Sequence, residues 1–254
     1  MRSFMVFLQK EWVELVRTKK FFILLCVFAL FGMLGPVTAR YMQEIIIIAM
    51  GDTMPLTVPP GTWIDSWGQF YSNMSQMGVI CIIFLFMGCV IGEKQSGSAA
   101  LSLTKNLSHT SFIIAKFSAA AIIFLISVLL ALLICFGYTY FLFGYAGEIS
   151  DVLMGIIAYG IFTLTLLAVI VLASTVSQNT TVSAILAFCA FIILSISSYI
   201  PQIGSMMPGI LLAKTVELST GETYSSITMA TVVSVCISAV CLYLSVLALK
   251  RQEI

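Results

Sequence analysis

Charged side chains are scarce in this sequence. Asp, Glu, Lys and Arg together make up 9% of its 254 residues, against 60% hydrophobic residues. So few charges in a chain of this length leave more apolar surface than one water-soluble core can bury, which excludes an ordinary soluble domain and indicates a membrane protein. The net charge of +1 identifies no partner by itself, and we expect no nucleic-acid partner.

Histidine is nearly absent, and the one copy, His109, has no acidic residue near it in the sequence. A histidine-based metal site or a Ser/His catalytic pair therefore has little support. The chain also lacks the HExxH, GxGxxG and G-x-x-x-x-G-K-[ST] motifs, and no lysine follows a glycine. The usual phosphate-cradling loop is thus excluded, and we expect a non-catalytic chain with no catalytic residue, metal or cofactor of its own.

Paired cysteine motifs are missing as well. The seven cysteines lie in apolar runs, with no CxxC pair and no neighbouring histidine: Cys26, Cys81, Cys89, Cys135, Cys189, Cys236 and Cys241. This pattern is typical of cysteines that act as small hydrophobic residues.

Five long stretches contain no Asp, Glu, Lys or Arg, and they define the predicted membrane spans. A helix needs about 20 mostly apolar residues to cross a bilayer. The longest stretch, 152–213, is too long for one helix, and the polar run SQNTT at 177–181 divides it. Six spans result, at about residues 21–39, 74–92, 117–143, 153–176, 182–200 and 227–249.

The spans are predicted to be helices, because lipid offers no hydrogen-bond partner to exposed backbone and the runs lack the ten-residue alternation of barrel strands. The expected fold is an all-α polytopic membrane protein, with residues 1–254 forming a single transmembrane domain. Ten of the twelve Lys and Arg fall on the side that holds both termini, and only Arg40 and Lys214 fall on the other. Basic flanks stay in the cytoplasm, so both termini are predicted to be cytoplasmic, in a bacterial plasma membrane.

The first twenty residues predict an amphipathic helix. Apolar positions recur at helical spacing and charged positions lie around the other face: Phe4, Leu8, Trp12 and Leu15 against Lys10, Glu11, Glu14 and Arg17. Such an interfacial helix can lie among lipid headgroups, with Lys19 and Lys20 fixing the turn into the first span. A lead-in that merely anchors the chain explains the same residues.

A signal peptide is a further alternative for this segment, because a basic stretch, an apolar core and the small residues at 37–39 imitate one. The basic stretch is unusually long, however, and Pro36 falls inside the would-be cleavage site. These two features favour a retained segment.

The connections on the predicted outer side are short and apolar. Trp63 and Trp67 precede the second span and are expected at the headgroup level. Residues 201–213, which begin with Pro201, are too few to span a membrane and too apolar for solvent. We expect a partly re-entrant or surface-lying helix there, with a simple helix hairpin packed on the bundle as the alternative.

No ionisable residue falls inside the six predicted spans. Proton-driven carriers and pumps usually place Asp, Glu or His within the membrane. A sodium-coupled carrier would need broken helices in two related halves, and the sequence shows no such repeat. The energy for any transport is therefore expected to come from a separate protein.

One charged stretch, GEKQSGS at residues 92–98, interrupts the apolar sequence after the second span. Its second glycine permits a sharp turn, and its serines can cap a short helix that continues toward the next lysine. The pattern predicts a helix across the membrane surface that is available to a soluble partner through Glu93, Lys94, Gly97, Ser98, Leu101 and Lys105. An ordinary solvated loop is the alternative.

The basic N-terminal helix, the six spans and the sequence E-K-x-x-G-[ST] after the second span resemble the type-2 ABC exporter permeases. That family forms the membrane half of ATP-driven exporters, of the kind associated with peptide, bacteriocin or drug export. The residues that match its pattern are Glu93, Lys94, Gly97, Leu101 and Lys116. Gln95 replaces the second acid of the pattern and Ser98 its threonine, and the Pro and Arg often found later are replaced around residues 108–111.

The resemblance implies a coupling helix at residues 93–105 that docks on a separate ABC ATPase subunit carrying ATP and Mg, with the N-terminal helix touching the same partner. It also implies a pair of permease copies and a re-entrant turn before the last span. The cargo path would be lined by the first, second and fifth spans and would suit an amphipathic or hydrophobic cargo, above all a peptide.

Polar side chains near the outer end of that path are Ser195, Ser197, Ser198 and Tyr199. A role in helix packing explains them equally well. Drug or lipid export by the same machinery, an intramembrane enzyme, and a passive channel or scaffold without an ATPase stay open as alternatives.

Overall fold

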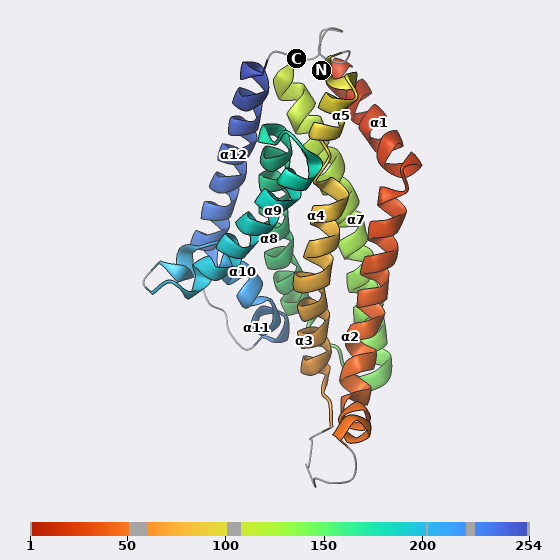
Figure 1. Cartoon of the computed structure of the whole chain (residues 1–254). Helices are drawn as coiled ribbons and strands as arrows, with labels where there is room; N and C mark the ends of the chain where they lie inside the picture. The colour runs from red at the N-terminus through yellow and green to blue at the C-terminus, as the bar shows by residue number, and fades with distance from the viewer. Residues whose placement is uncertain (1, 51–59, 101–107, 202, 222–226, 253–254) are drawn as a thin grey trace.

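Every regular element in the described part of the chain is helical (Figure 1). The computed structural model describes residues 2–50, 60–100, 108–201, 203–221 and 227–252. The longer helices are α1 (Arg2–Arg17), α2 (Lys20–Met50), α3 (Trp63–Asn73), α4 (Val79–Phe86), α7 (His109–Phe143), α8 (Ile149–Val176), α9 (Thr180–Ile196) and α12 (Thr228–Arg251). The short ones are η1 (Met74–Gly78), α5 (Ile91–Gln95), η2 (Ser197–Tyr199), η3 (Gly204–Met206), α10 (Gly209–Ala213) and α11 (Thr215–Thr220).

Six stretches of helix are long and apolar enough to cross a membrane, which confirms the predicted number of spans and the all-α polytopic fold. They are Lys20–Glu44, Trp63–Gln95, His109–Phe143, Ile149–Val176, Thr180–Tyr199 and Thr228–Arg251. Both labelled termini lie at one end of the bundle, together with α5 (Figure 1). We call this the terminal end.

The second span begins earlier than the sequence indicated, at Trp63 rather than near Met74. Thr62 caps the helix: its hydroxyl accepts a hydrogen bond from the Asp65 backbone, and the Asp65 carboxylate accepts one from the Thr62 N–H at 2.8 Å. This reciprocal capping box satisfies two backbone donors that a helix start leaves open. The Trp67 indole is buried in the bundle and donates to the Ala146 carbonyl at 3.0 Å, so it does not lie among headgroups as its sequence position suggested.

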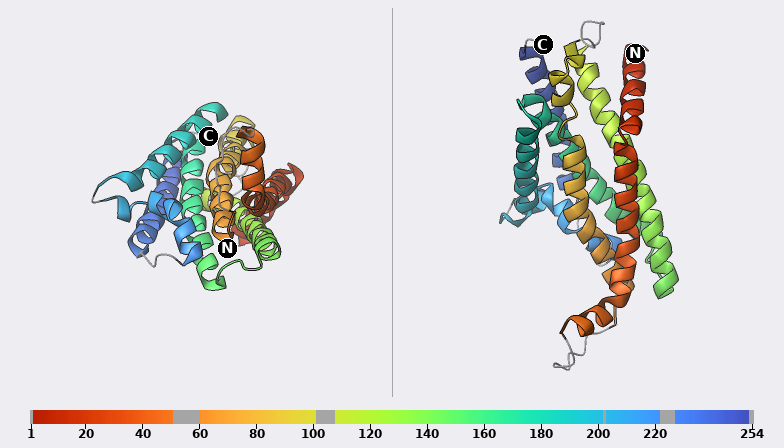
Figure 2. Two further views of the ribbon diagram at one scale, coloured as in Figure 1. Left: turned by 90° about the horizontal axis from the view of Figure 1, so that it is seen from below. Right: turned by 45° about the vertical axis from the view of Figure 1, so that its right-hand side comes forward.

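The π-helical turn η1 joins α3 to α4 within this span. Such a turn leaves backbone carbonyls without the usual helical partner. The Met74 carbonyl accepts the π-type hydrogen bond from the Val79 N–H, and the Tyr159 hydroxyl, buried on α8, also donates to it at 3.1 Å. This bond ties the second span to α8, which also packs against α7, α9, α10, α11 and α12 (Figure 2).

The segment between α9 and α12 folds into short helices rather than one long one. Its consecutive helices α10 and α11 pack on α8, and Leu211 and Leu218 are buried there beside Phe162. The approach of α11 is close, because a Cβ added to Gly155 of α8 would overlap the Ser219 hydroxyl. The segment is therefore packed on the bundle, and its depth in a membrane stays a prediction.

Candidate functional site

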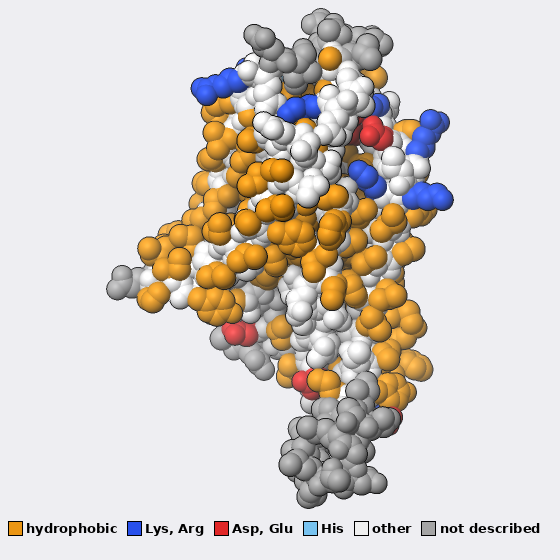
Figure 3. Space-filling model, viewed as in Figure 1, with side chains coloured by type: hydrophobic (Ala, Val, Ile, Leu, Met, Phe, Trp, Pro, Cys, Tyr) orange, Lys and Arg blue, Asp and Glu red, His pale blue; other side chains and the backbone are white. Residues whose placement is uncertain are grey.

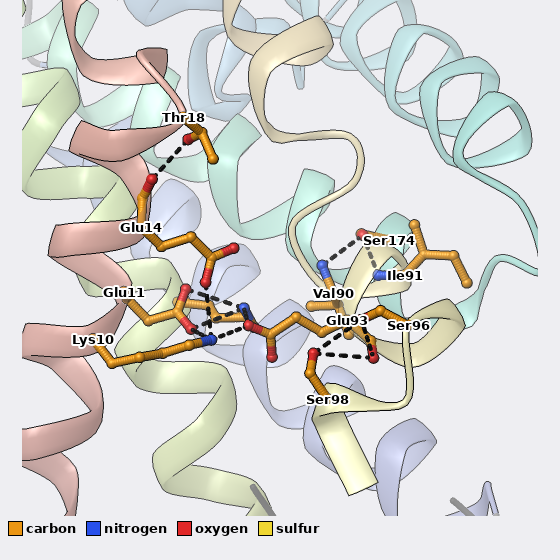
Figure 4. Close-up of polar contacts among 11 residues, drawn as sticks. Lys10, Glu11, Glu14, Thr18, Val90, Ile91, Glu93, Ser96, Ser98 and Ser174 are labelled. Atoms are coloured by element: carbon orange, nitrogen blue, oxygen red, sulfur yellow. Dashed lines mark hydrogen bonds and ion pairs between the residues drawn. The ribbon is translucent and has the colours of Figure 1, made fainter. Parts of the chain in front are cut away.

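Five charged side chains from three helices meet at the terminal end, and Figure 4 labels four of them, Lys10, Glu11, Glu14 and Glu93. We call them the ionic cluster: Lys10, Glu11 and Glu14 from α1, Glu93 from α5 and Lys116 from α7. Glu93 belongs to the charged stretch that the sequence singled out. In the cluster Glu93 meets Lys10, which lies 83 positions earlier in the chain, and Lys116, which lies 23 positions later.

The two lysines link the three carboxylates. The Lys116 ammonium lies 3.0 Å from a Glu11 oxygen and 3.2 Å from a Glu93 oxygen. The Lys10 ammonium pairs with Glu93, and it also lies 3.1 Å from Glu11 and 2.9 Å from Glu14. Each lysine therefore bridges α1 to α5, and Lys116 adds α7 to the junction.

Most of the cluster is shielded from solvent. Glu11 is 5% exposed, Glu93 7% and Lys116 4%. Removing one partner of a buried pair leaves an uncompensated charge and typically costs about 3–5 kcal/mol. The cluster therefore holds α1, α5 and α7 in one arrangement as long as all its members are present.

Lys10 lies at the edge of the cluster and is partly exposed. Partial burial alone would lower the pKa of Lys10, but its hydrogen bond to Glu93 and the carboxylates of Glu11 and Glu14 outweigh burial and raise that pKa above its usual value. Lys10 therefore stays protonated throughout the physiological pH range.

Carboxylate oxygens of Glu11, Glu14 and Glu93 lie within 4.8 Å of one another, a spacing that oxygen-preferring cations can use. The ammonium groups of Lys10 and Lys116 already lie against these carboxylates, so ion pairs account for the grouping. A cavity of about 350 Å³ adjoins the cluster, and Glu93 Oε2 is buried with no hydrogen-bond partner among the described residues. The arrangement suits a mechanical junction better than a catalytic centre.

Helix α5 is also fastened to the end of α8. The Ser174 hydroxyl accepts hydrogen bonds from the backbone N–H groups of Val90 and Ile91, at 3.0 and 3.1 Å. The Lys94 ammonium donates to the Thr175 carbonyl at 2.9 Å, in the last turn of α8. A cation suits that position because helix C-termini carry partial negative charge.

Beyond α5 the chain turns sharply at Gly97, whose φ of 73° favours glycine. Residues 98–100 are helical, in agreement with the start of the predicted surface helix. Leu101 and Lys105 lie outside the described residues. Glu93 was predicted to be available to a soluble partner, whereas the structure turns its side chain inward. The exposed residues of the stretch are Gly92 and residues 95–97.

Residues 5–216, from α1 to the start of α11, match the family model of the ABC-2 family transporter proteins. The chain belongs to the ABC-2 transporter family. Over 133 residues the ABC-2 protein is also 29% identical to the uncharacterized transmembrane protein YxlG of Bacillus subtilis (strain 168). The alignment covers half of each protein, so the chain spans about half the length of the curated relative it matches. Family membership confirms the resemblance seen in the sequence and supports a membrane permease subunit of an ABC transporter.

The N-terminal helix of the ABC-2 protein packs along α7 and meets the start of α2 (Figure 2). Phe7 stacks near Phe112 at 5.3 Å between ring centroids, and Trp12 near Phe21 at 5.8 Å. The apolar stripe packs partly on protein, since Leu15 is buried while Phe4, Leu8 and Trp12 are half-buried, and its position among headgroups stays a prediction. The turn after the helix falls at Lys19, with φ 61°. Exposed positions on this helix include Glu14 and Arg17, and Lys19 is exposed in the turn that follows.

Glu11 was not predicted to be a site residue, although its position in the sequence indicates burial. Glu11 shares the helical face of the apolar stripe, because positions 4, 8, 11 and 15 follow the 4-3-4 spacing of one face. A carboxylate in register with buried positions must find a partner. Lys20, predicted as part of the turn, lines the cavity beside the cluster.

The serines proposed for the cargo path of the ABC-2 protein mostly close the end of α9. Ser197 donates to the Leu194 carbonyl at 2.6 Å and Ser198 to the Ser195 carbonyl at 3.0 Å. Tyr199 is exposed, and the Ser195 hydroxyl is buried with no partner in the described part of the chain. These contacts favour a packing role for Ser197 and Ser198.

A second polar feature, on the second span, was not predicted from the sequence. Side chains on one face of α3 and η1 recur at helical spacing and are exposed or half-buried: Asp65, Gln69, Ser72, Asn73 and Gln76, the polar stripe. Figure 3 shows a pale strip in the region of α3, between hydrophobic flanks. The stripe was missed because the second span was expected to start near Met74.

Proposed function

We propose that this ABC-2 protein is the membrane permease of an ATP-driven exporter. A separate ABC ATPase subunit, which binds ATP and Mg, supplies the energy. The observation that carries the proposal is the ionic cluster, which joins the exposed region around α5 to the N-terminal helix α1 and to the third span, α7. Family membership supports the same assignment.

The ATPase docks on what we call the coupling surface: residues 94–105 and the exposed face of α1. The docking side chains include Lys94, Ser98, Leu101 and Lys105, with Gly97 shaping the turn between them. Glu93 is a positioning residue in this proposal, because its carboxylate holds α5 to Lys10 and Lys116. A push on the coupling surface then moves three helices together, since packed elements shift between discrete arrangements rather than deforming smoothly.

Two copies pair in a plasma membrane, with the terminal end in the cytoplasm and the polar stripe bordering a shared path. Gln69 and Asn73 have no side-chain hydrogen bond within the described residues. An amide facing apolar surroundings without a partner costs about 1–3 kcal/mol in proteins. A helix of 33 residues exceeds the roughly 20 needed to cross the bilayer, so the stripe begins near the outer surface and extends inward.

The cargo that fits such a path is amphipathic. Polar side chains run along the stripe, while large hydrophobic side chains such as Met77 and Phe84 are exposed farther along the same span. An exported peptide offers both kinds of surface and is our first choice. Export of a hydrophobic drug or a lipid by the same machinery is the second.

Replacement of residues 98–105 by a Gly/Ser linker of equal length tests the docking role without disturbing Glu93. We expect the variant to lose co-purification with the ATP-hydrolysing subunit while still eluting as a folded membrane protein. An equal replacement of residues 51–58, between α2 and α3, is the matched control and should keep the partner. Unchanged association of the first variant, or equal loss in both, would count against the assigned surface.

The rival classes differ in what the isolated chain does. A passive channel or an intramembrane enzyme would act in vesicles that contain only this chain, without nucleotide. The exporter proposal expects no such activity until the ATPase subunit and ATP are added.

A further inference from the structure

A second cavity, of about 700 Å³, lies between α8, α9 and α12 at the terminal end. Eight of the ten side chains that line it are aliphatic, and the two others are Arg251 and Gln252. Its volume falls within the range of about 300–1,000 Å³ typical of sites for small molecules. We call it the aliphatic cleft.

The two polar residues of the cleft come from the end of α12. Arg251 is exposed and has no ion-pair or hydrogen-bond partner in the part of the chain that the structure describes. Gln252 donates through Nε2 to the Thr175 carbonyl at 3.3 Å, while its Oε1 is buried with no partner among the described residues. The cleft therefore offers one positive charge and one unused acceptor. No acidic residue is among the described residues that line it.

The walls of the cleft belong to membrane-spanning helices. Val176, Leu186 and Leu244 line it and are 53%, 43% and 44% exposed, respectively. In a bilayer, side chains this exposed on spans contact acyl chains rather than water. Hydrophobic side chains cover the flank of α12, and basic side chains lie at its terminal end (Figure 3). The occupant must therefore combine a long apolar chain with a negatively charged head.

We propose that the aliphatic cleft binds one anionic phospholipid. An acyl chain lies along the aliphatic wall, and the phosphate accepts hydrogen bonds from the Arg251 guanidinium, whose planar fork suits a phosphate oxygen pair. A hydroxyl of the headgroup donates to Gln252 Oε1 and satisfies that buried acceptor. Basic pockets between membrane helices recognise anionic lipid headgroups in this way. The proposal is independent of the transport role.

Native mass spectrometry of the full chain in detergent tests the proposal, with phosphatidylglycerol and phosphatidylcholine of identical acyl chains as probes. Phosphatidylglycerol should stay bound and phosphatidylcholine should not. Arg251→Gln should weaken phosphatidylglycerol binding at least about tenfold, which corresponds to a loss of about 1.4 kcal/mol. Lys250→Gln removes the same charge from the neighbouring residue, which does not line the cleft, and should change binding less than about twofold.

A second variant separates the apolar wall from the charged mouth. Leu186→Trp fills the cleft and should reduce phosphatidylglycerol binding with Arg251 intact. Inorganic phosphate at the same concentration should displace none of the lipid, because it lacks the acyl chain. Equal retention of both lipids, equal effects of Arg251→Gln and Lys250→Gln, no effect of Leu186→Trp, or displacement by inorganic phosphate would each overturn the proposal. Unchanged elution profiles show that the variants are folded.

Discussion

Lys116 is a buried ammonium group that is stable only because two carboxylates face it. Lys116→Met leaves Glu11 and Glu93 buried with Lys10 as their shared counterion. We expect the free energy of unfolding to fall by about 3–5 kcal/mol, measured by chemical or thermal unfolding in detergent. The double variant Glu11→Gln/Lys116→Met should be more stable than Lys116→Met alone, since it removes one of the unpaired charges.

Lys250→Met is the control for that substitution, because Lys250 is exposed and has no ion pair within the described residues. It should change stability by less than about 1 kcal/mol. If Lys116→Met lowered the free energy of unfolding as little as Lys250→Met does, the result would contradict a stabilising role for the buried ion pairs of Lys116. A further loss of stability on adding Glu11→Gln would contradict it as well.

The sequence identified single charged residues of the junction but not their partnership. Glu93 follows the charge-free stretch that ends at residue 92, Lys116 precedes the one that begins at residue 117, and both match the permease pattern, which is read from local sequence. Their pairing with Glu11 and Lys10 depends on α1 folding back along α7, a contact between residues 105 positions apart. No spacing rule carries such information, so the inward orientation of Glu93 could not be predicted.

Gly155 sets the distance between α8 and α11. A Cβ at this position would overlap the Ser219 hydroxyl and approach the Thr215 carbonyl. Gly155→Ala should therefore lower the free energy of unfolding by about 1–3 kcal/mol and increase hydrogen exchange in residues 209–220. Gly160→Ala on the same helix meets no atom within 4 Å and should be neutral, or stabilising by up to about 1 kcal/mol. Equal effects at the two glycines would show that α11 does not pack closely on α8.

Ser174 anchors α5 through two backbone N–H groups, those of Val90 and Ile91. Ser174→Ala leaves both buried donors without their acceptor, and we expect a loss of about 1–3 kcal/mol with faster hydrogen exchange at residues 90–95. Thr175→Val is the matched control, because its buried hydroxyl donates only within α8, to the Val171 carbonyl. If Thr175→Val accelerates hydrogen exchange at α5 as much as Ser174→Ala does, the Ser174 hydroxyl does not anchor α5.

Helix boundaries could be predicted where the composition of the sequence changes. They could not be predicted where capping or packing determines the first or last residue of the helix. The break between α8 and α9 was found because the run SQNTT is polar. The start of α3 was missed because the span was expected to begin near Met74, whereas Asp65 closes a capping box with Thr62 and the helix begins at Trp63. Helix α2 likewise continues past Pro36 to Met50, since neighbouring helices in a bundle can compensate for a proline.

For the whole molecule, the number of spans followed from composition alone. A spanning helix needs about 20 apolar residues, and the charge-free stretches of this sequence can hold only a small number of such helices. Six spans were predicted, and six helices of suitable length and composition are observed among the described residues. The fold of residues 197–220 was harder to foresee, because those residues bury Leu211 and Leu218 against α8 through contacts far apart in sequence. The polar stripe was hidden for the same reason: its exposure depends on which face of α3 the bundle covers.

The central claim is that a separate ATPase moves the spans through the coupling surface. The most direct measurement is the labelling rate of Gln76→Cys, on the exposed polar stripe, by a membrane-impermeant maleimide in proteoliposomes. The seven native cysteines are first replaced by serine. With the ATPase subunit present, ATP and vanadate should change the rate several-fold, whereas the chain alone and the 98–105 linker variant should not respond. An equal change without the ATPase, or in the linker variant, would contradict the claim.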